Sequence, residues 1–261
     1  VMTDNSDDKN FPPGKRQYTL DFAYHGGIYR DVWMIGKSSV AITDALEAVK
    51  VAGGGVFVHF DNISGKKAEV YVDTEVHNSG KRTRTVAVET VLADAGDVPV
   101  KRISQQVKLQ AGESKTVRQQ FAVRNPKLWS PDSPYLYRIQ SRVKAGHEVL
   151  DGGVTRVGIR KAEFKGKDGF WLNGKPFGQL VGANRHQDFA YVGNALPNSQ
   201  QWRDAKRLRD AGCTIIRVAH YPQDPAFMDA CDEMGLFVIV ATPGWQYWNK
   251  NPEFAKLVHR N

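Results

Sequence analysis

The sequence predicts an antiparallel β-sandwich followed by a run of parallel β/α units. From about residue 17 to 170, apolar and polar side chains alternate with a period of two, and turn-forming residues separate the alternating stretches. From residue 171 onward, nearly continuous apolar stretches alternate with helical patterns that begin at capping residues and end at glycine. The length of 261 residues is enough for two domains of ordinary size.

Five stretches in the first half have the pattern of half-buried strands. They are AEVYVDTEV (68–76), TVAVETVLA (85–93), QQVKLQAG (105–112), KTVRQQFAV (115–123) and YLYRIQSRVKA (135–145). Turn sequences separate them without an intervening helix, which is typical of an antiparallel sandwich. We expect Trp129, in the proline-rich loop 125–134, to pack against this domain, and VAGGGVF (51–57) to form a turn or bulge between two strands.

The second half repeats strand and helix three times. The strands are KPFGQLVGANRH (175–186), TIIRVAH (214–220) and LFVIVATPG (236–244), and the helices are 197–212, 224–235 and 251–261. Asn198 or Ser199 can cap the first helix, while Asp224 and Pro225 begin the second. Right-handed crossovers make such strands parallel, which leaves a doubly wound sheet and an eightfold barrel open. The first strand is not followed by GxGxxG, so nucleotide binding is disfavoured.

Composition argues against several functions. The net charge of +8 is spread over the chain without a dense block of Lys and Arg, so we expect a solvated surface and no nucleic-acid partner. No apolar run approaches the roughly 18 residues of a membrane-spanning helix. The first residues, VMTDNSDDKNFPPG, lack the features of a signal peptide. Cys213 and Cys231 lack metal-ligand spacing and are expected to be free thiols, so the redox compartment stays open.

Polar residues stand at the ends of all three predicted parallel strands. These candidates for a site are Asn184, His186 and Asp188 after the first strand, Arg217 and His220 at the second, and Trp245 after the third. The carboxyl ends of barrel strands hold the chemistry of that fold, so the residues would share one rim. Burying Arg217 among Ile and Val requires a partner, for which Asp188 and a carboxylate elsewhere on the rim are candidates. The acidic residues along the helices are expected to be solvated: Asp204, Asp210, Asp229, Asp232 and Glu233.

The sequence contains three linked motifs, HGGIYR (25–30), NRH (184–186) and HYP (220–222), in this order and spacing. Together they resemble glycoside hydrolase family 2, which includes β-galactosidases, β-glucuronidases and β-mannosidases. The resemblance implies a mainly β immunoglobulin-like sandwich followed by an incomplete (β/α)8 TIM barrel with its first three β/α units. It divides the chain into the end of a jelly-roll sugar-binding domain (1–36), the sandwich (37–162) and the start of the catalytic barrel (163–261).

The resemblance also implies an activity and a set of site residues. His186 and His220 would face the sugar, and Arg217 would order the site around the catalytic carboxylates, with Asn184, Asp188 and Trp245 completing the substrate-binding residues. Retaining hydrolysis needs two carboxylates. By resemblance both are glutamates beyond Asn261, so the chain would hold no catalytic residue and would be inactive alone. The favoured substrates are β-galactosides. The alternatives are a β-glucuronidase or other member of the family, and a catalytically dead module that binds carbohydrate or protein.

The resemblance leaves the cofactor, the partners and the compartment less defined. Relatives often carry Glu near the metal-binding side where this chain has Gln187, so no metal ligand is assigned, and Mg²⁺ is left to the full-length parent. The expected partner is a β-linked oligosaccharide or polysaccharide. Exposed strand edges favour a homo-oligomer, and no membrane is involved. An upstream signal peptide would place the protein in the periplasm or outside the cell; without one it would be cytoplasmic.

Overall fold

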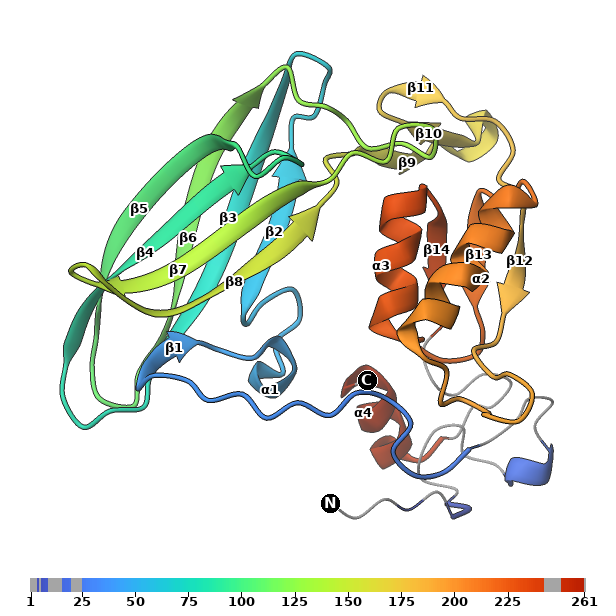
Figure 1. The fold of residues 1–261 in the computed structure, drawn as a ribbon, viewed down its shortest axis with the longest axis horizontal. Coiled ribbons are helices and arrows are strands. Elements are labelled where there is room, and N and C mark those ends of the chain that lie inside the picture. The colour runs from blue at the N-terminus through green and yellow to red at the C-terminus, as the bar shows by residue number, and fades with distance from the viewer. Residues whose placement is uncertain (1–3, 5, 9–15, 20–24, 242–249, 261) are drawn as a thin grey trace. The chain divides into compact units, whose positions relative to one another are not determined.

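The computed structural model describes residues 4, 6–8, 16–19, 25–241 and 250–260 (Figure 1). The chain forms two compact units. One comprises Met34–Gly178, and the other comprises Val1–Trp33 together with Gln179–Asn261.

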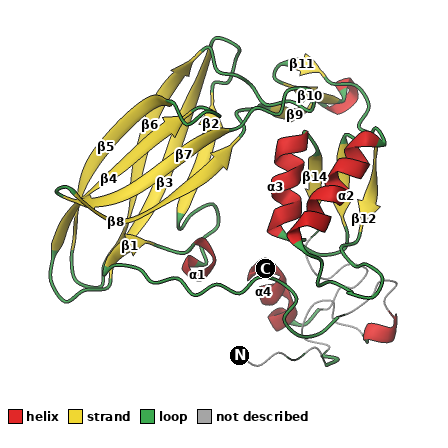
Figure 2. Ribbon diagram, in the orientation of Figure 1, coloured by secondary structure: helices red, strands yellow, loops and turns green. Residues whose placement is uncertain are grey.

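The unit Met34–Gly178 contains a β-sandwich of two antiparallel sheets (Figure 2). The first sheet consists of β1 (Val40–Ile42), β2 (Val56–Asp61), β3 (Lys67–Asn78) and β6 (Ser114–Arg124). Strand β3 is its centre, because β6 pairs along one edge from residue 67 to 77 while β2 and β1 pair with successive stretches of the other edge.

The second sheet has the strand order β5-β4-β7-β8. Its strands are β4 (Arg84–Ala93), β5 (Pro99–Leu109), β7 (Tyr137–Ala145) and β8 (Glu148–Val157). The alternating residues of the two inner faces make the core, in which Val70, Val72, Leu92 and Ile139 are fully buried. All five predicted strands are confirmed, and β8 is a strand that the sequence analysis did not identify.

The connections of this unit differ in part from the expectation. VAGGGVF does form a turn, but a short helix, α1 (Ala45–Ala48), precedes it instead of a strand. Trp129 is packed as predicted, with 1% of its surface exposed. A Cβ atom on Gly158 would come within 2.9 Å of the Trp129 indole, so this position requires glycine. Residues 25–39 form no strand, although their sequence resembles the closing strands of a jelly roll.

A small antiparallel sheet completes the unit Met34–Gly178, and the described residues also include two 3-10 turns. The sheet has the order β11-β10-β9, from β9 (Ala162–Phe164), β10 (Phe170–Leu172) and β11 (Lys175–Pro176). The 3-10 turns are η1 (Gln17–Thr19), which belongs to the other unit, and η2 (Gly166–Asp168). The predicted strand 175–186 is therefore two short strands, β11 and β12 (Gly182–Arg185), separated by residues 177–181.

The other unit contains a parallel sheet of the order β12-β13-β14. After β12 come α2 (Asn198–Asp210), β13 (Ile215–Val218), α3 (Pro225–Met234), β14 (Phe237–Val240) and α4 (Pro252–Arg260). The predicted β/α alternation is confirmed. One face of the sheet packs on α2 and α3 through a core that includes Ala205, Ile216, Val218 and Phe227, each with no exposed surface. Among the described residues, no helix has the length and apolarity to cross a membrane.

The ends of α2 and α3 show which of the predicted capping residues are used. Asp224 caps α3, because its Oδ1 accepts a hydrogen bond from the Ala226 backbone nitrogen at 2.9 Å. Gly235 ends the same helix in the left-handed conformation with φ 75°, as predicted. The prediction for α2 is wrong, because Pro197 occupies its N-cap position and no side chain caps it. Asn198 already lies inside this helix.

We expect acid to destabilise the sandwich below about pH 4.5, through Glu75 on β3. A hydrogen bond from Lys50 lowers the pKa of this nearly buried carboxylate from 4.5, and the Thr43 and Thr116 hydroxyls add to the effect. The unfolded chain therefore binds more protons than the folded chain. The stabilisation is complete above pH 4.5 and is lost as the pH falls through the folded pKa. Urea-unfolding midpoints followed by circular dichroism between pH 3 and 7 measure this loss.

The matched variants are Glu75→Gln and Glu148→Gln, since Glu148 is exposed at the start of β8. Glu75→Gln is expected to flatten the fall in the midpoint between pH 5 and pH 3, whereas Glu148→Gln leaves it unchanged. An equal acid dependence in the wild type and Glu75→Gln would contradict the assignment.

Candidate functional site

The two faces of the parallel sheet have different environments. In register, Asn184 lies beside Arg217, and Arg185 lies beside Val218. Successive side chains of a strand point to opposite faces. Val218 belongs to the core beneath α2 and α3, so Arg185 shares the helix-covered face while Asn184 and Arg217 lie on the other one. In a (β/α) barrel, this other face would line the interior.

Three of the predicted site residues come together at the carboxyl ends of β12 and β13. The Arg217 Nη1 lies 3.3 Å from the His220 Nδ1. The rings of His186 and His220 meet edge to face, with their centroids 5.2 Å apart. His220 is buried, and His186 and Arg217 are half-buried. These contacts join two strand ends that lie 34 residues apart along the chain, from His186 to His220.

The Arg217 contact determines the chemistry of the His220 ring. A guanidinium group can only donate hydrogen bonds, so the His220 Nδ1 must accept. The ring is then neutral and carries its proton on Nε2, which makes Nε2 a hydrogen-bond donor. A neutral imidazole with a fixed donor, next to a permanent cation, suits the binding of hydroxyl groups and of anionic oxygen.

The other predicted site residues have more varied positions. Asn184 is exposed on β12 beside Arg217. Asp188 is exposed, and it lies close enough to Tyr221 that its charge, after burial as the main cause, raises the pKa of the Tyr221 phenol. Trp245 lies outside the described residues. The expected pairing of Asp188 with Arg217 is wrong: within residues 25–241 the structure shows no ion pair between them, and Arg217 contacts His220.

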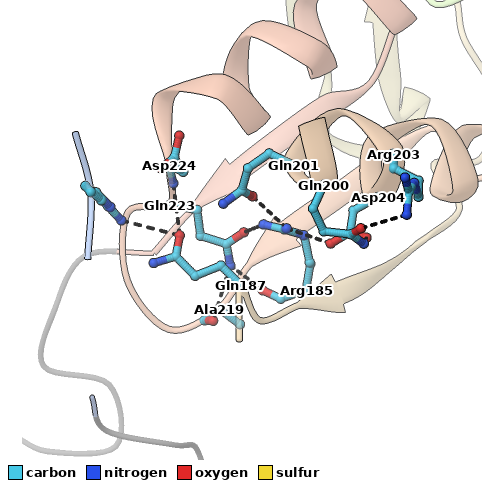
Figure 3. Close-up of polar contacts among 10 residues, drawn as sticks. Arg185, Gln187, Gln200, Gln201, Arg203, Asp204, Ala219, Gln223 and Asp224 are labelled. Carbon is cyan, nitrogen blue, oxygen red and sulfur yellow. Dashed lines mark hydrogen bonds and ion pairs between the residues drawn. The ribbon is translucent and has the colours of Figure 1, made fainter. Parts of the chain in front are cut away.

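Arg185 is the deeply buried cation of this region, with only 6% of its surface exposed. Figure 3 shows its polar contacts with Gln201, Asp204 and Gln223. Its Nη2 donates to the Asp204 Oδ2 at 2.7 Å and to the Gln201 Oε1 at 2.8 Å, both on α2. Its Nη1 donates to the Gln223 Oε1 at 2.6 Å. The guanidinium carbon lies 4.0 Å from the centre of the Phe227 ring on α3. The expectation that Asp204 is solvated is therefore wrong, because this carboxylate compensates the buried charge.

Gln187 forms a second connection between the strand-end loops. Its Oε1 accepts a hydrogen bond from the Asp224 backbone nitrogen at 3.0 Å, which ties the β12 loop to the start of α3. Arg30 approaches from the N-terminal segment, and its Nη2 lies 3.5 Å from the same oxygen and 2.6 Å from the Pro222 carbonyl oxygen. Gln187 is 1% exposed, so its side chain holds the loops together, whereas the Asp188 side chain is exposed.

Three residues of this region were not expected from the sequence: Arg185, Gln223 and Arg30. Strand alternation contained the signal for Arg185, because Asn184 and Arg185 must point to opposite faces and only one face meets the helices. Gln223 and Arg30 lie in loop or extended segments, where no periodicity shows what a side chain contacts.

The cysteines and the acidic residues show no metal-binding cluster in the described part of the chain. No three His, Cys, Asp or Glu side chains gather there in an arrangement that could hold an ion. Cys213 and Cys231 are both free, as predicted, and burial raises the pKa of the Cys231 thiol to about 12. At neutral pH Cys231 is therefore a protonated core residue.

Known proteins resemble this chain across both units. The sequence model for glycosyl hydrolases family 2 matches residues 54–160, and the model for the TIM barrel domain of that family matches residues 163–256. A β-galactosidase of Thermoanaerobacter pseudethanolicus is 34% identical over 95% of this chain and 31% of its own length. A β-glucuronidase of Bacteroides fragilis is 30% identical over 85% of this chain and 31% of its own length.

Solved structures agree with these relatives. Bacteroides uniformis β-glucuronidase 2 superposes with a TM-score of 0.86 at 28% identity, covering 99% of this chain and 30% of that protein. The chain thus spans about a third of the length of the relatives it matches. The sandwich corresponds to the immunoglobulin-like domain, and the β/α units correspond to the start of the TIM barrel. On these grounds, this chain belongs to glycoside hydrolase family 2.

Proposed function

We propose that this chain is part of a retaining β-glycosidase that hydrolyses terminal β-linked galactose in oligosaccharides or polysaccharides. The observation that carries the proposal is the convergence of His186, His220 and Arg217 at the carboxyl ends of β12 and β13, in a chain of this family. Two imidazoles and a guanidinium supply hydrogen-bond donors that sugar hydroxyls require. The cation would also keep a neighbouring catalytic carboxylate ionised.

The catalytic carboxylates are proposed to lie beyond Asn261. Retaining hydrolysis needs an acid to protonate the leaving oxygen and a second carboxylate to attack the anomeric carbon. Near the strand ends, Asp204 is engaged by Arg185, and Asp224 caps α3. Of these three described acids, Asp188 is the exposed one, and one carboxylate cannot perform both tasks. Residues 1–261 would therefore bind and orient the sugar without cleaving it.

A β-glucuronidase is the second candidate, because proteins with this name are as similar to the chain as several β-galactosidases are. The two sugars differ in the configuration at C4 and at C6, where glucuronate carries a carboxylate that must be bound by an additional cation or donor. The substrate assay below distinguishes them directly.

The test is to express the complete reading frame that contains residues 1–261 and, separately, residues 1–261 alone. We expect the complete protein to release nitrophenol from p-nitrophenyl β-D-galactoside faster than from the β-D-glucuronide and β-D-mannoside. We expect no turnover by the 261-residue chain. Preference for the glucuronide would establish the second candidate. Turnover by the short chain, or inactivity of the complete protein on all three substrates, would overturn the proposal.

A further inference from the structure

We propose that Gln223 is a positioning residue for the sugar site, and that Arg185 holds its amide in the orientation this role requires. The inference rests on the proposed function, since it concerns the loops that carry His186 and His220. Neither Gln223 nor Arg185 is placed to meet a sugar, because both are at least nine-tenths buried, with exposures of 4% and 6%. Their effect on the site must pass through the backbone of these loops.

The amide of Gln223 joins the ends of β12 and β13. Its Nε2 donates a hydrogen bond to the Arg185 carbonyl oxygen, and it lies 3.5 Å from the Ala219 carbonyl oxygen (Figure 3). The Ala219 backbone nitrogen donates to the same Arg185 carbonyl at 2.9 Å. The last backbone groups of the two strands therefore share one buried donor.

The two bridged carbonyls belong to the residues immediately before the histidines. Arg185 precedes His186, and Ala219 precedes His220. A rotation of either peptide group would move the following imidazole, and the two rings are only 5.2 Å apart. Catalytic groups tolerate little displacement, since a misplacement of about 1 Å can cost about 100-fold in rate. The Gln223 bridge thus fixes the separation of the two imidazoles.

Arg185 determines which way the Gln223 amide points. A guanidinium group has no acceptor, so the atom that faces Arg185 Nη1 at 2.6 Å must be the Oε1. The Nε2 is then directed toward the two carbonyls. Arg185 itself is fixed by α2 through Asp204 and by α3 through the Phe227 ring. The packed helices α2 and α3 therefore fix the position of the strand ends through Arg185 and Gln223.

The decisive variant is Gln223→Glu in the complete protein. Glutamate keeps the size of the side chain and its contact with Arg185, but it replaces the bridging donor by an oxygen that repels both carbonyls. We expect kcat at 25 °C to fall by about 10- to 100-fold with a smaller change in KM. The melting temperature is expected to fall as well, because the unsatisfied carbonyls lie in a buried site. Gln106→Glu makes the same chemical change at an exposed position of β5 and is expected to leave kcat, KM and the melting temperature unchanged.

Hydrogen exchange of the peptide covering residues 216–226, in the same protein, gives a readout independent of activity. We expect faster exchange in Gln223→Glu than in the wild type and in Gln106→Glu. If the wild type cleaves a β-glycoside and Gln223→Glu has unchanged kcat and unchanged exchange, the inference is overturned. A lower melting temperature with unchanged kcat at 25 °C also overturns it, because the role is then only structural. If the wild type cleaves no glycoside, the proposed function fails, and faster exchange in the variant still supports the bridge while equal exchange overturns it.

Discussion

Replacing Arg217 with alanine is expected to lower kcat/KM of the complete protein by about 100- to 1000-fold, the usual cost of removing one oriented donor from a site that stabilises charge. Arg217 lies on the sheet face away from the helices. Its described side-chain hydrogen bond is the one to the His220 Nδ1. The variant would remove a cation from the site and also release the His220 ring, whose Nδ1 could then carry the proton. Both changes act on the face of the strands away from the helices, and neither disrupts the core beneath α2 and α3.

The matched control for this variant is Arg203→Ala. Arg203 is exposed on α2, where its Nη1 donates to the Gln200 Oε1 of the same helix at 3.2 Å. We expect kinetics and melting temperature like those of the wild type for this control. Steady-state kinetics of both variants on the preferred nitrophenyl glycoside make the comparison. Loss of less than 10-fold in Arg217→Ala would show that Arg217 does not order the site.

The sandwich was predictable because its signal is local and repeated. In β6, for example, the buried residues Val117, Gln119, Phe121 and Val123 alternate with exposed ones, so the sequence itself shows which side faces the core. Short strands without this alternation were harder to predict. The three-residue strand β1 is buried throughout, and only its pairing with β3 defines it as a strand.

The candidate site was predictable only in part, because contacts between elements determine the roles of its residues. The sequence placed Arg217, His186 and His220 at strand ends, and the structure brings them together. It also suggested that the costly buried cation is Arg217, whereas the structure assigns that burial to Arg185. The difference depends on which face of β12 the helices cover. One helix residue, Asp204, is then a half-buried partner of Arg185 and not the solvated acid that was expected.

Replacing Arg185 with alanine is expected to destabilise the β/α unit by about 3–5 kcal/mol, the cost of breaking a buried ion pair from one side. The variant would remove the donor that the Asp204 Oδ2 and the side-chain amide oxygens of Gln201 and Gln223 share. It would also remove the guanidinium that packs on the Phe227 ring. The measurement is the opening free energy of α2 and α3 from native-state hydrogen exchange, which reports this unit separately from the sandwich.

Two variants on α2 distinguish the burial of the charge from the presence of an ion pair. Lys206→Ala breaks the neighbouring pair with Asp210, whose side chains are 65% and 59% exposed, so we expect no measurable change in opening free energy. Asp204→Asn keeps an acceptor for Arg185 but removes the compensating charge, and we expect a loss between those of the other two variants. Equal effects of Arg185→Ala and Lys206→Ala would contradict the assignment. The loss of opening free energy is expected to decrease in the order Arg185→Ala, Asp204→Asn, Lys206→Ala. This order follows from desolvation, because a charge removed from water depends on its partner while a solvated charge does not.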